Sequence, residues 1–321
     1  MVFSLAALFA LLACGGDGEN NDVGNEETTV SDSTSLRIAV MPTLDCLPIY
    51  VACDAGIFER ESLSVTLVPF TAHMDCDTAI AGGSVYVMPT DLVRAERLMH
   101  QGTPLRYLTT TNLGWQLLTA KTARIRKMEQ LDDKMLAMTR YSATAMLADQ
   151  FVDSAKLQTE RVFRIQVNDV LVRLNMMETG TMDAMLLPEP QATVARKLGC
   201  NMLYDTNSLL MGAIVCRADT LRPQRQMQTF IKAYNEACDS LNTRGLDYYR
   251  DLIATHCHVE KDVVDSLVVQ HPTLFHHASP PRQKDIDRAK TWLGYLSVNK
   301  KQGVQRPSDK KSKSRNKNTK K

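Results

Sequence analysis

The sequence LRIAVMPTLDCLPIYVACDAGIFERESLSVTLVPF, residues 36–70, decides the expected fold class. Apolar side chains alternate from Leu36 and again from Leu63, as they do in two short strands. Between them, residues 47–58 form an apolar stretch of helical length that ends near Gly56. A strand, a helix and a second strand in this order predict a βα-repeating domain with a mainly parallel sheet.

The same alternation continues along the chain. In the first group, a helix, a strand, a helix and a strand are expected at residues 75–81, 85–88, 91–101 and 105–110. In a second group, after Trp115, we expect strands at 135–139, 162–167, 183–187 and 202–204, and helices at 143–155, 170–178 and 190–198. Two consecutive groups predict two α/β lobes.

A returning strand is expected at residues 209–215, and the pattern then becomes purely helical. The expected helices are amphipathic and lie near residues 227–241, 249–257, 261–269 and 281–298. Their apolar faces must pack on a sheet that is already built, and the first lobe is the nearest. We therefore expect lobe one at residues 36–112 plus 209–299 and lobe two at residues 113–208, with two crossovers between them.

The N-terminal apolar run ends at Leu11-Leu12-Ala13-Cys14, which resembles a bacterial lipobox. The run is about half of the roughly 20 residues that a membrane-spanning helix needs. We expect residues 1–13 to be a signal peptide and Cys14 to be lipidated, so that acyl chains anchor the protein to a membrane. No Lys or Arg precedes the run, which an upstream start codon would explain. The alternative is an ordinary secretory signal with a chance cysteine.

Charge is concentrated at the two ends of the chain. Residues 14–35 carry six acids and no base, and residues 300–321 carry ten Lys or Arg and one Asp. We expect a disordered acidic tether and a disordered basic tail, because neither segment can bury an apolar core. The net charge of the chain is +2, so the body between these ends is nearly neutral and favours no nucleic-acid partner. The tail either binds phosphate or anionic lipid or is simply solvated.

The cysteines give no metal pattern. Apart from Cys14, seven cysteines remain, and no CxxC motif is present. Cys46 and Cys76 follow neighbouring expected strands, so a disulfide between them is geometrically plausible, and two free thiols are the alternative. The histidines at 256, 258, 276 and 277 lie in the helical return segment without a carboxylate at fixed spacing, so we expect no metal site.

Three stretches resemble the periplasmic solute-binding proteins that include nitrate, sulfonate, taurine and aminopyrimidine (thiamine-precursor) binders. Residues 36–70 contain a GIFE-x-x-x-L-x-V link between the first two strands. Residues 77–93, DTAIAGGSVYVMPTDLV, are similar to the family's A-L-x-x-G-x-V-D element, with Tyr86 where an Asp is usual. Residues 177–199, METGTMDAMLLPEPQATVARKLG, resemble its G-x-(I/V)-D-A-x-x-x-x-E-P segment.

The resemblance implies a two-lobe periplasmic-binding-protein fold of type II. It also implies a small-molecule ligand, an ABC permease and an ATPase as partners, and no chemistry or cofactor of the protein's own. Together with Cys14 it predicts a monomeric, lipid-anchored protein of the bacterial cell envelope that faces the periplasm or the exterior. The expected mechanism is hinge closure, with hinges near residues 111–114 and 205–212.

The ligand is expected at the carboxyl ends of the strands, where helix N-termini also point. The loops at those ends, together with Trp115 as a stacking wall, supply the candidate binding residues Thr43, Leu44, Asp45, Cys46, Thr71, His73, Asp75, Thr90, Asp91, Trp115, Arg140, Tyr141, Ser142, Asn168, Asp169 and Glu189. Helix capping is the alternative role for Asp45, Asp75, Asp91, Ser142 and Asp169. Because this set contains five carboxylates against Arg140 and His73, the charge favours a cationic or amine ligand such as an aminopyrimidine.

Two other functions fit the same fold. Relatives in thiamine-precursor and menaquinone biosynthesis are enzymes, although no nucleophile–base pair or glycine-rich phosphate loop stands out in this sequence. A lipid-anchored sensor that passes its ligand to another surface protein is the second alternative, and the sequence does not discriminate it from a transport subunit.

Overall fold

The computed structural model describes residues 35–206, 209–219, 224–270 and 274–302. The predicted signal peptide, Cys14 and almost all of the acidic tether lie outside the described residues. The basic tail from residue 303 onward also lies outside the described residues, whereas residues 300–302 belong to the last helix. None of the described helices is long and apolar enough to cross a membrane.

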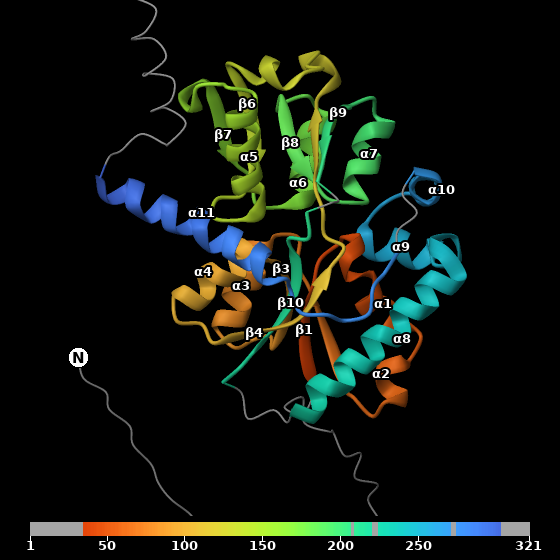
Figure 1. Cartoon of the computed structure of the whole chain (residues 1–321). Coiled ribbons are helices and arrows are strands. Elements are labelled where there is room, and N and C mark those ends of the chain that lie inside the picture. The colour runs from red at the N-terminus through yellow and green to blue at the C-terminus, as the bar shows by residue number, and fades with distance from the viewer. Residues whose placement is uncertain (1–34, 207–208, 220–223, 271–273, 303–321) are drawn as a thin grey trace, which may run out of the picture. The chain divides into compact units, whose positions relative to one another are not determined.

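The first lobe is built on a five-stranded mixed sheet with the order β2–β1–β3–β10–β4 (Figure 1). Its strands are β1 (Leu36–Val40), β2 (Val65–Pro69), β3 (Val87–Asp91), β4 (Leu105–Thr111) and β10 (Gly212–Arg217). β1 pairs in parallel with β2 and β3, whereas β10 is antiparallel to β3 and β4. The lobe's own helices are α1 (Leu47–Asp54), α2 (Ile57–Arg60), α3 (His73–Ala81) and α4 (Leu92–His100), and a short 3-10 helix, η1 (Leu44–Cys46), precedes α1.

The second lobe repeats this plan with the order β7–β6–β8–β5–β9. Its strands are β5 (Gln116–Thr119), β6 (Lys134–Met138), β7 (Val162–Gln166), β8 (Ala184–Leu187) and β9 (Asn201–Asp205). Its helices are α5 (Ala143–Ser154), α6 (Val170–Glu178) and α7 (Gln191–Lys197), with 3-10 turns η2 (Lys121–Ala123), η3 (Met128–Leu131) and η4 (Thr159–Arg161). β5 is antiparallel to β8 and β9, so each lobe has one antiparallel strand inside an otherwise parallel sheet.

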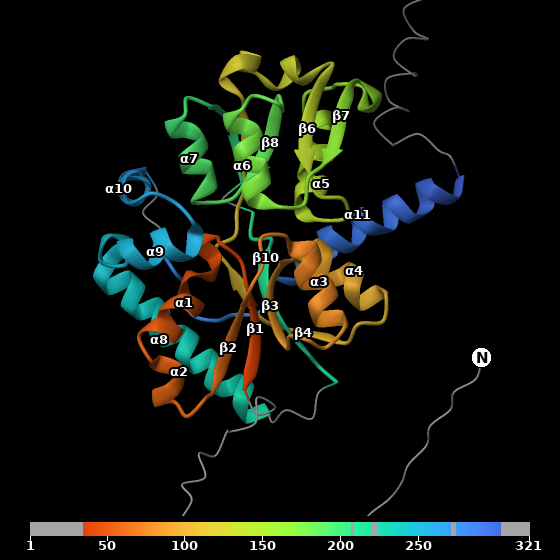
Figure 2. The same ribbon diagram turned by 180° about the vertical axis from the view of Figure 1, so that it is seen from behind.

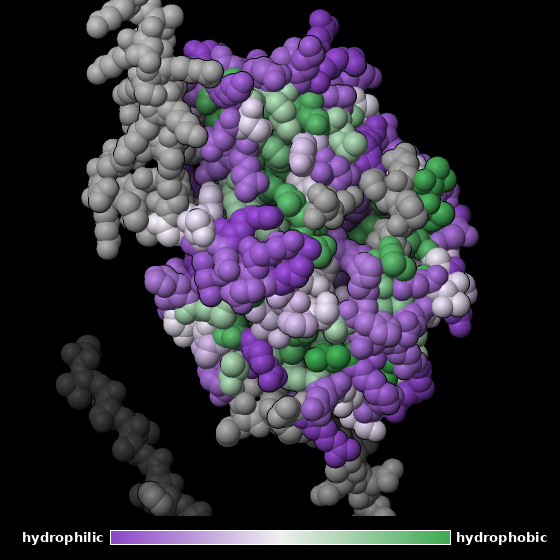
Figure 3. All heavy atoms as spheres, viewed as in Figure 1, coloured by the Kyte–Doolittle hydropathy of each residue, from purple (hydrophilic) through white to green (hydrophobic). Residues whose placement is uncertain are grey.

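Apolar side chains on both faces of each sheet explain the layered arrangement. In lobe one, α3 and α4 cover one face, and α1, α2 and the C-terminal α8 cover the other (Figures 1 and 2). In lobe two, α5 packs with Leu136 and Leu186 on one face. α6 and α7 lie with Ala137 and Met185 on the other. The outer surface seen in Figure 3 is mainly hydrophilic, as expected when the apolar residues fill these layers.

The C-terminal helices are α8 (Gln224–Tyr248), α9 (Arg250–Cys257), α10 (Lys261–Gln270) and α11 (Gln283–Gln302). α8 and α9 pack on α1, and α11 packs on α4, so the predicted attachment to lobe one is confirmed. The second lobe is also contacted, because α10 lies against α7 and the Trp292 indole of α11 donates to Asp149 at 3.0 Å.

Two chain segments join the lobes, from β4 to β5 and from β9 to β10. They are hydrogen-bonded to each other, since Trp115 N donates to Thr206 Oγ1 at 2.8 Å and Thr206 N to Trp115 O at 3.0 Å. A Cβ atom at Gly212 would lie 2.4 Å from Leu113 Cβ and from Thr111 Oγ1. Only glycine therefore fits where the two segments approach each other.

Candidate functional site

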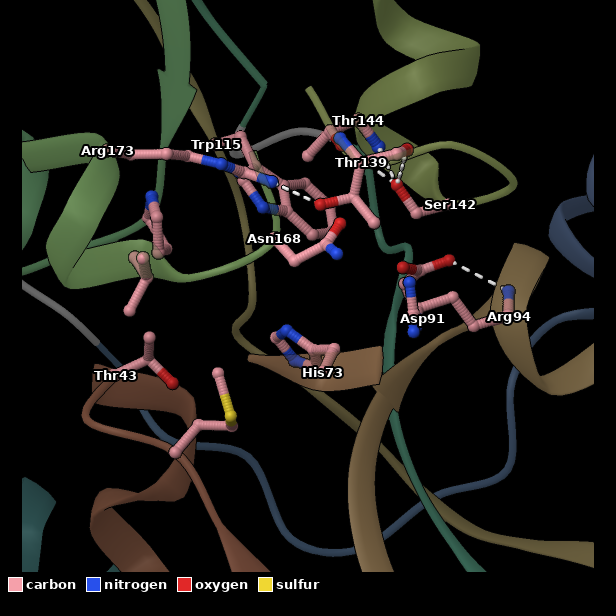
Figure 4. A pocket seen from close by; sticks show the side chains of 13 residues that line it. Thr43, His73, Asp91, Arg94, Trp115, Thr139, Ser142, Thr144, Asn168 and Arg173 are labelled. Atoms are coloured by element: carbon pink, nitrogen blue, oxygen red, sulfur yellow. Dashed lines mark hydrogen bonds between the residues drawn. The ribbon is translucent and has the colours of Figure 1, made fainter. Parts of the chain in front are cut away.

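A small cavity lies between the lobes. Both lobes contribute to its walls (Figure 4). Lobe one supplies Met41, Thr43, His73, Asp91 and Arg94; the connecting segment and lobe two supply Trp115, Thr139, Ser142, Thr144, Asn168, Val170, Arg173 and Pro188.

Several predicted binding residues line this cavity: Thr43, His73, Asp91, Trp115, Ser142 and Asn168. The structure brings them together from strand ends of both lobes. The predicted residues that do not line it are Leu44, Asp45, Cys46, Thr71, Asp75, Thr90, Arg140, Tyr141, Asp169 and Glu189. Asp45, Cys46 and Thr90 are buried elsewhere, and Asp75 and Arg140 are exposed.

Some of these remaining residues hold the two lobes together beside the cavity. Thr71 Oγ1 of lobe one donates to Asp169 Oδ2 of lobe two at 2.5 Å, and Val170 N donates to Thr71 O at 3.0 Å. The Arg97 guanidinium of α4 lies 5.3 Å from the centre of the Tyr141 ring, a cation–π distance. Interlobe contacts therefore flank the cavity where the sequence predicted ligand contacts.

A second set of interlobe bonds lies at the start of α7. Leu44 N donates to Glu189 O at 3.0 Å. The Gln191 side chain is fully buried and donates from Nε2 to Pro42 O at 2.6 Å. Gln191 was not predicted, and its only signal in the sequence is its position at the start of α7, just after the loop that follows β8.

Arg94 is the first functional residue that the sequence analysis missed. It lies in the first turn of α4, is 1% exposed and pairs with Asp77 of α3 through Nε (3.3 Å) and Nη2 (2.5 Å). Its Nη1 atom is buried without a hydrogen-bond partner. Arg94 therefore lines the cavity with its charge balanced by Asp77, and its Nη1 atom is a donor without an acceptor.

Arg173 of α6 is the second missed residue, and its surroundings differ. It is 5% exposed and donates to three uncharged oxygens: Nε to Val167 O at 2.7 Å, Nη1 to Leu186 O at 3.1 Å and Nη2 to the Thr139 hydroxyl. None of the carboxylates in the described parts of the chain forms an ion pair with it. Burial, and next the charge of Arg94, lower the pKa of Arg173 to about 10, against the opposing attraction of Asp169, so Arg173 stays cationic at neutral pH.

His73 at the start of α3 is neutral. Burial, reinforced by the charges of Arg94 and Arg173, lowers the pKa of its imidazole to about 3. Its Nε2 atom is buried without a hydrogen-bond partner. A neutral imidazole offers one donor and one acceptor, so His73 can contact a solute without adding charge.

The other polar side chains leave mostly donors for a solute. Asn168 Oδ1 accepts from Gln166 Nε2 at 3.0 Å, which leaves the Asn168 amide hydrogens as the available polar groups. The hydroxyls of Ser142 and Thr144 bond to each other at 2.8 Å, and Ser142 also donates to Thr139 O at 2.7 Å. Trp115, Met41, Val170 and Pro188 form the apolar part of the wall.

The capping alternative is correct for three of the five candidate residues. Asp91 caps α4 by accepting from Arg94 N, Ser142 caps α5 by accepting from Thr144 N, and Asp169 caps α6 by accepting from Leu171 N and Val172 N. Asp45 lies inside η1, and Asp75 lies in the first turn of α3, which begins after Ala72 without a side-chain cap. Asp91 and Ser142 combine capping with a place in the cavity wall.

The charge argument for a cationic solute rests on a wrong premise. Of the five predicted carboxylates, only Asp91 lines the cavity. Asp169 binds Thr71, and Glu189 pairs with Arg196 at 3.1 Å. Asp45 and Asp75 do not line the cavity either. Arg140 is exposed, whereas Arg94 and Arg173, which the sequence analysis did not consider, are buried in the wall.

Cys46 and Cys76 are free thiols in this structure. Each contacts Met41: Met41 N donates to Cys46 Sγ at 3.4 Å, and Cys76 Sγ lies 3.8 Å from Met41 Sδ. The disulfide alternative is therefore not realised. The described residues contain no group of three side chains able to hold a metal ion. Instead, His256 stacks on Tyr50 at 4.0 Å between ring centres.

Comparison with known proteins gives a family. The model of the NMT1-like family matches residues 30–254, more than two thirds of the chain. A comparison with curated protein sequences finds no match.

Solved structures of similar fold are also found. The alkanesulfonate-binding protein SsuA from Xanthomonas axonopodis pv. citri, bound to MOPS, has a TM-score of 0.71 and 15% identity over 83% of this chain and 93% of that chain. The periplasmic nitrate-binding protein NrtA from Synechocystis PCC 6803 has a TM-score of 0.65 and 12% identity over 79% and 74%. A Candida albicans gene product with the generic periplasmic binding protein structural fold has a TM-score of 0.63 and 12% identity over 82% and 90%.

The family resemblance carried by residues 36–70, 77–93 and 177–199 is confirmed, because the family model spans all three. The low identities to the solved structures establish the architecture and leave the ligand open. The chain therefore belongs to the NMT1-like family and has the two-lobed α/β fold of the periplasmic binding proteins.

Proposed function

We propose that this protein is the solute-binding subunit of an ABC importer in a bacterial cell envelope, with a permease and an ATPase as partners. The observation that carries the proposal is a small cavity whose walls come from both lobes and which is flanked by direct interlobe bonds. The names of similar structures, binders of alkanesulfonates and nitrate, support the same role. Lipid anchoring through Cys14 remains part of this proposal.

The mechanism is hinge closure. A solute that contacts both walls binds the closed form better than the open form, and this difference shifts the population toward closure. The two connecting segments are the hinge, since they lead from one sheet to the other and bond to each other at Trp115 and Thr206. In the closed form, Thr71–Asp169 and Gln191–Pro42 add interlobe bonds that a permease can recognise as a joined surface.

The solute that the cavity fits best is a small anion, such as a sulfonate, a carboxylate or an inorganic oxyanion. Arg94 Nη1 and the Asn168 amide are donors without a carboxylate or carbonyl partner, and neutral His73 adds one more polar contact. Arg173 supplies a positive charge that no described carboxylate pairs with, and planar guanidinium groups match oxyanions well. An anion would compensate this buried charge, whereas an amine would add a second one.

A thermal-shift screen of the full-length protein tests the function and the solute class together. The arms are ethanesulfonate, taurine, nitrate, acetate and a 4-aminopyrimidine. We expect at least one anion to raise Tm, since a ligand at 100 times its Kd stabilises by about 2.7 kcal/mol, and we expect the aminopyrimidine to have no effect. The variant Arg161→Gln, which changes an exposed arginine of lobe two, is the matched control and should respond like the wild type.

Stabilisation by the aminopyrimidine alone would contradict the anion proposal and restore the amine hypothesis. If chromatography shows that the protein converts any of these compounds into a product, the enzyme alternative is favoured instead.

A further inference from the structure

The last helix, α11, is fixed to lobe one. The segment before it extends the edge of the sheet at β4, since Thr110 N donates to Ser279 O at 2.8 Å. Within the helix, the Lys290 ammonium lies 3.5 Å from a carboxylate oxygen of Glu96 on α4, and Ala289 is fully buried beside α4. When the lobes part, α11 therefore moves with lobe one.

One side chain of α11 reaches across to lobe two. The Trp292 indole donates from Nε1 to Asp149 Oδ2 of α5 at 3.0 Å, and the ring also packs on the apolar cluster that α4 and α5 share. Asp149 is 8% exposed, and its Oδ1 atom lies 3.0 Å from Nη2 of Arg164 on β7. Figures 1 and 2 show α11 between α4 of lobe one and α5 of lobe two. Trp292 thus joins the lobes through residues that do not line the cavity.

A second C-terminal helix also contacts lobe two, but through a weaker polar contact. α10 lies against α7, where Lys197 Nζ is 2.5 Å from Asp262 Oδ2. These two side chains are 33% and 69% exposed, and ion pairs in water contribute little to stability. Asp149 is buried, by contrast, and a hydrogen bond to a charged acceptor is stronger than one between neutral groups. Of the two contacts, we therefore expect the one made by Trp292 to hold lobe two.

The contact at Trp292 can also release without leaving a buried charge alone. When α11 and α5 separate, Asp149 keeps Arg164 as its ion-pair partner, because both residues belong to lobe two. The indole N–H and the second carboxylate oxygen become accessible to water, which can bond to both. Separation therefore breaks one hydrogen bond to a charged acceptor and one apolar contact, so the bond can form and break repeatedly at equilibrium.

We propose that Trp292 is a latch, a residue of lobe one that fastens lobe two in the closed form and must release Asp149 each time a solute enters or leaves. The inference rests on the proposed hinge motion, since a latch has no role in lobes that stay closed. Trp292 is thereby a positioning residue, because it acts on the cavity through α5 and does not line it. Loss of its N–H should raise the equilibrium constant for opening at least about 10-fold.

Hydrogen exchange of single amides, followed by NMR in the full-length protein without solute, measures this opening. Three backbone N–H groups donate across the seam and should exchange when the lobes part: Leu44 N to Glu189 O, Val170 N to Thr71 O and Ala143 N to Asp91 Oδ1, each at 3.0 Å. Two others donate within one lobe and are the internal controls: Phe70 N to Val40 O and Val167 N to Met138 O. In Trp292→Phe we expect the three interlobe amides to exchange at least about 10-fold faster than in the wild type, and the two intralobe amides to be unchanged.

The variant Trp292→His is the rescue. Its imidazole Nε2 and the indole Nε1 both lie two bonds from Cγ, so the histidine can donate to Asp149 from the same place. We expect Trp292→His to restore slow exchange, and Thr291→Ala, at an exposed neighbouring position of α11, to behave like the wild type. Both variants at position 292 leave Trp115 of the cavity wall as the only indole of the chain, so acrylamide quenching of Trp115 reports any shift of the resting population.

Equal exchange of the interlobe amides in Trp292→Phe and the wild type overturns the latch. Faster exchange of interlobe and intralobe amides alike also overturns it, because Trp292 would then stabilise the fold as a whole. A third contrary result is exchange in Trp292→His that is as fast as in Trp292→Phe. If the interlobe amides of the wild type are as strongly protected as the intralobe amides, the lobes do not part separately, and the hinge motion fails together with the latch. Solute binding is tested separately by the thermal-shift screen.

Discussion

The two buried arginines of the cavity differ in how their charge is balanced. In lobe one, Arg94 forms a two-point ion pair with Asp77, and both side chains are buried. In lobe two, Arg173 is equally buried but donates to carbonyl and hydroxyl oxygens only, and the charge of Asp169 attracts it without forming an ion pair. A buried charge without a counter-ion costs several kcal/mol of desolvation. The difference indicates that Arg94 holds lobe one together and that Arg173 is the charge offered to a solute.

The largest effect on stability is expected from breaking the buried ion pair between Arg94 and Asp77. Asp77→Ala removes the carboxylate and leaves Arg94 buried and unpaired, so the free energy of unfolding should fall by about 3–5 kcal/mol. Urea denaturation followed by circular dichroism measures it. Asp132→Ala, which breaks an exposed pair with Arg161, is the control and should cost no more than about 1 kcal/mol. Equal losses in the two variants would show that Arg94 does not depend on Asp77.

A smaller effect is expected at the interlobe contact beside the cavity. Thr71→Val removes the hydroxyl that binds Asp169 and leaves the α6 cap intact, so closure should weaken by about 1.5–3 kcal/mol, the value of a hydrogen bond to a charged group. Acrylamide quenching of Trp115 measures the shift toward the open form. Thr78→Val, on the exposed side of α3, should leave quenching unchanged. Unaltered quenching in Thr71→Val would mean that this bond does not hold the lobes.

An effect of similar size concerns His73 and acid. Its pKa is lowered from 6.5 to about 3, so the unfolded chain binds a proton that the folded protein does not, and stability is lost as pH falls from 6.5 toward 3. Asp45 and Asp91, with raised pKa values, act in the opposite direction between about pH 4 and 6. Comparison of the wild type with His73→Gln separates the contribution of His73 from those of the two aspartates. The variant should lose less stability than the wild type between pH 7 and pH 4.5. A parallel loss in both proteins would exclude the effect.

Most of the fold could be predicted because its strands and helices carry strong apolar periodicity. The strand Leu36–Val40 begins where the alternation predicts, and the helix Val170–Glu178 has the predicted bounds. β5 was missed, since Gln116–Thr119 is only four residues long and follows Trp115 directly. Its place between β8 and β9 comes from long-range antiparallel pairing, which local pattern does not encode.

Of the cavity-lining residues, only those in or beside the loops at strand ends were predicted. That rule located His73, Asp91 and Asn168, but Arg94 and Arg173 lie in the first turn of helices, beyond the loops. A signal was available for Arg173, because it is the only charged residue between Val170 and Met177 in an otherwise apolar and amide-bearing helix. Missing these two side chains reversed the expected charge of the solute.

The central claim is that Arg173, whose charge forms no ion pair with a described carboxylate, binds an anion between the lobes. Isothermal titration calorimetry of the wild type and of Arg173→Gln with the anion that gives the largest thermal shift tests it most directly, with Arg161→Gln as control. We expect the wild type and Arg161→Gln to bind equally, and Arg173→Gln, shown to be folded by circular dichroism, to bind at least about 10-fold more weakly. Unchanged affinity in folded Arg173→Gln would contradict the claim.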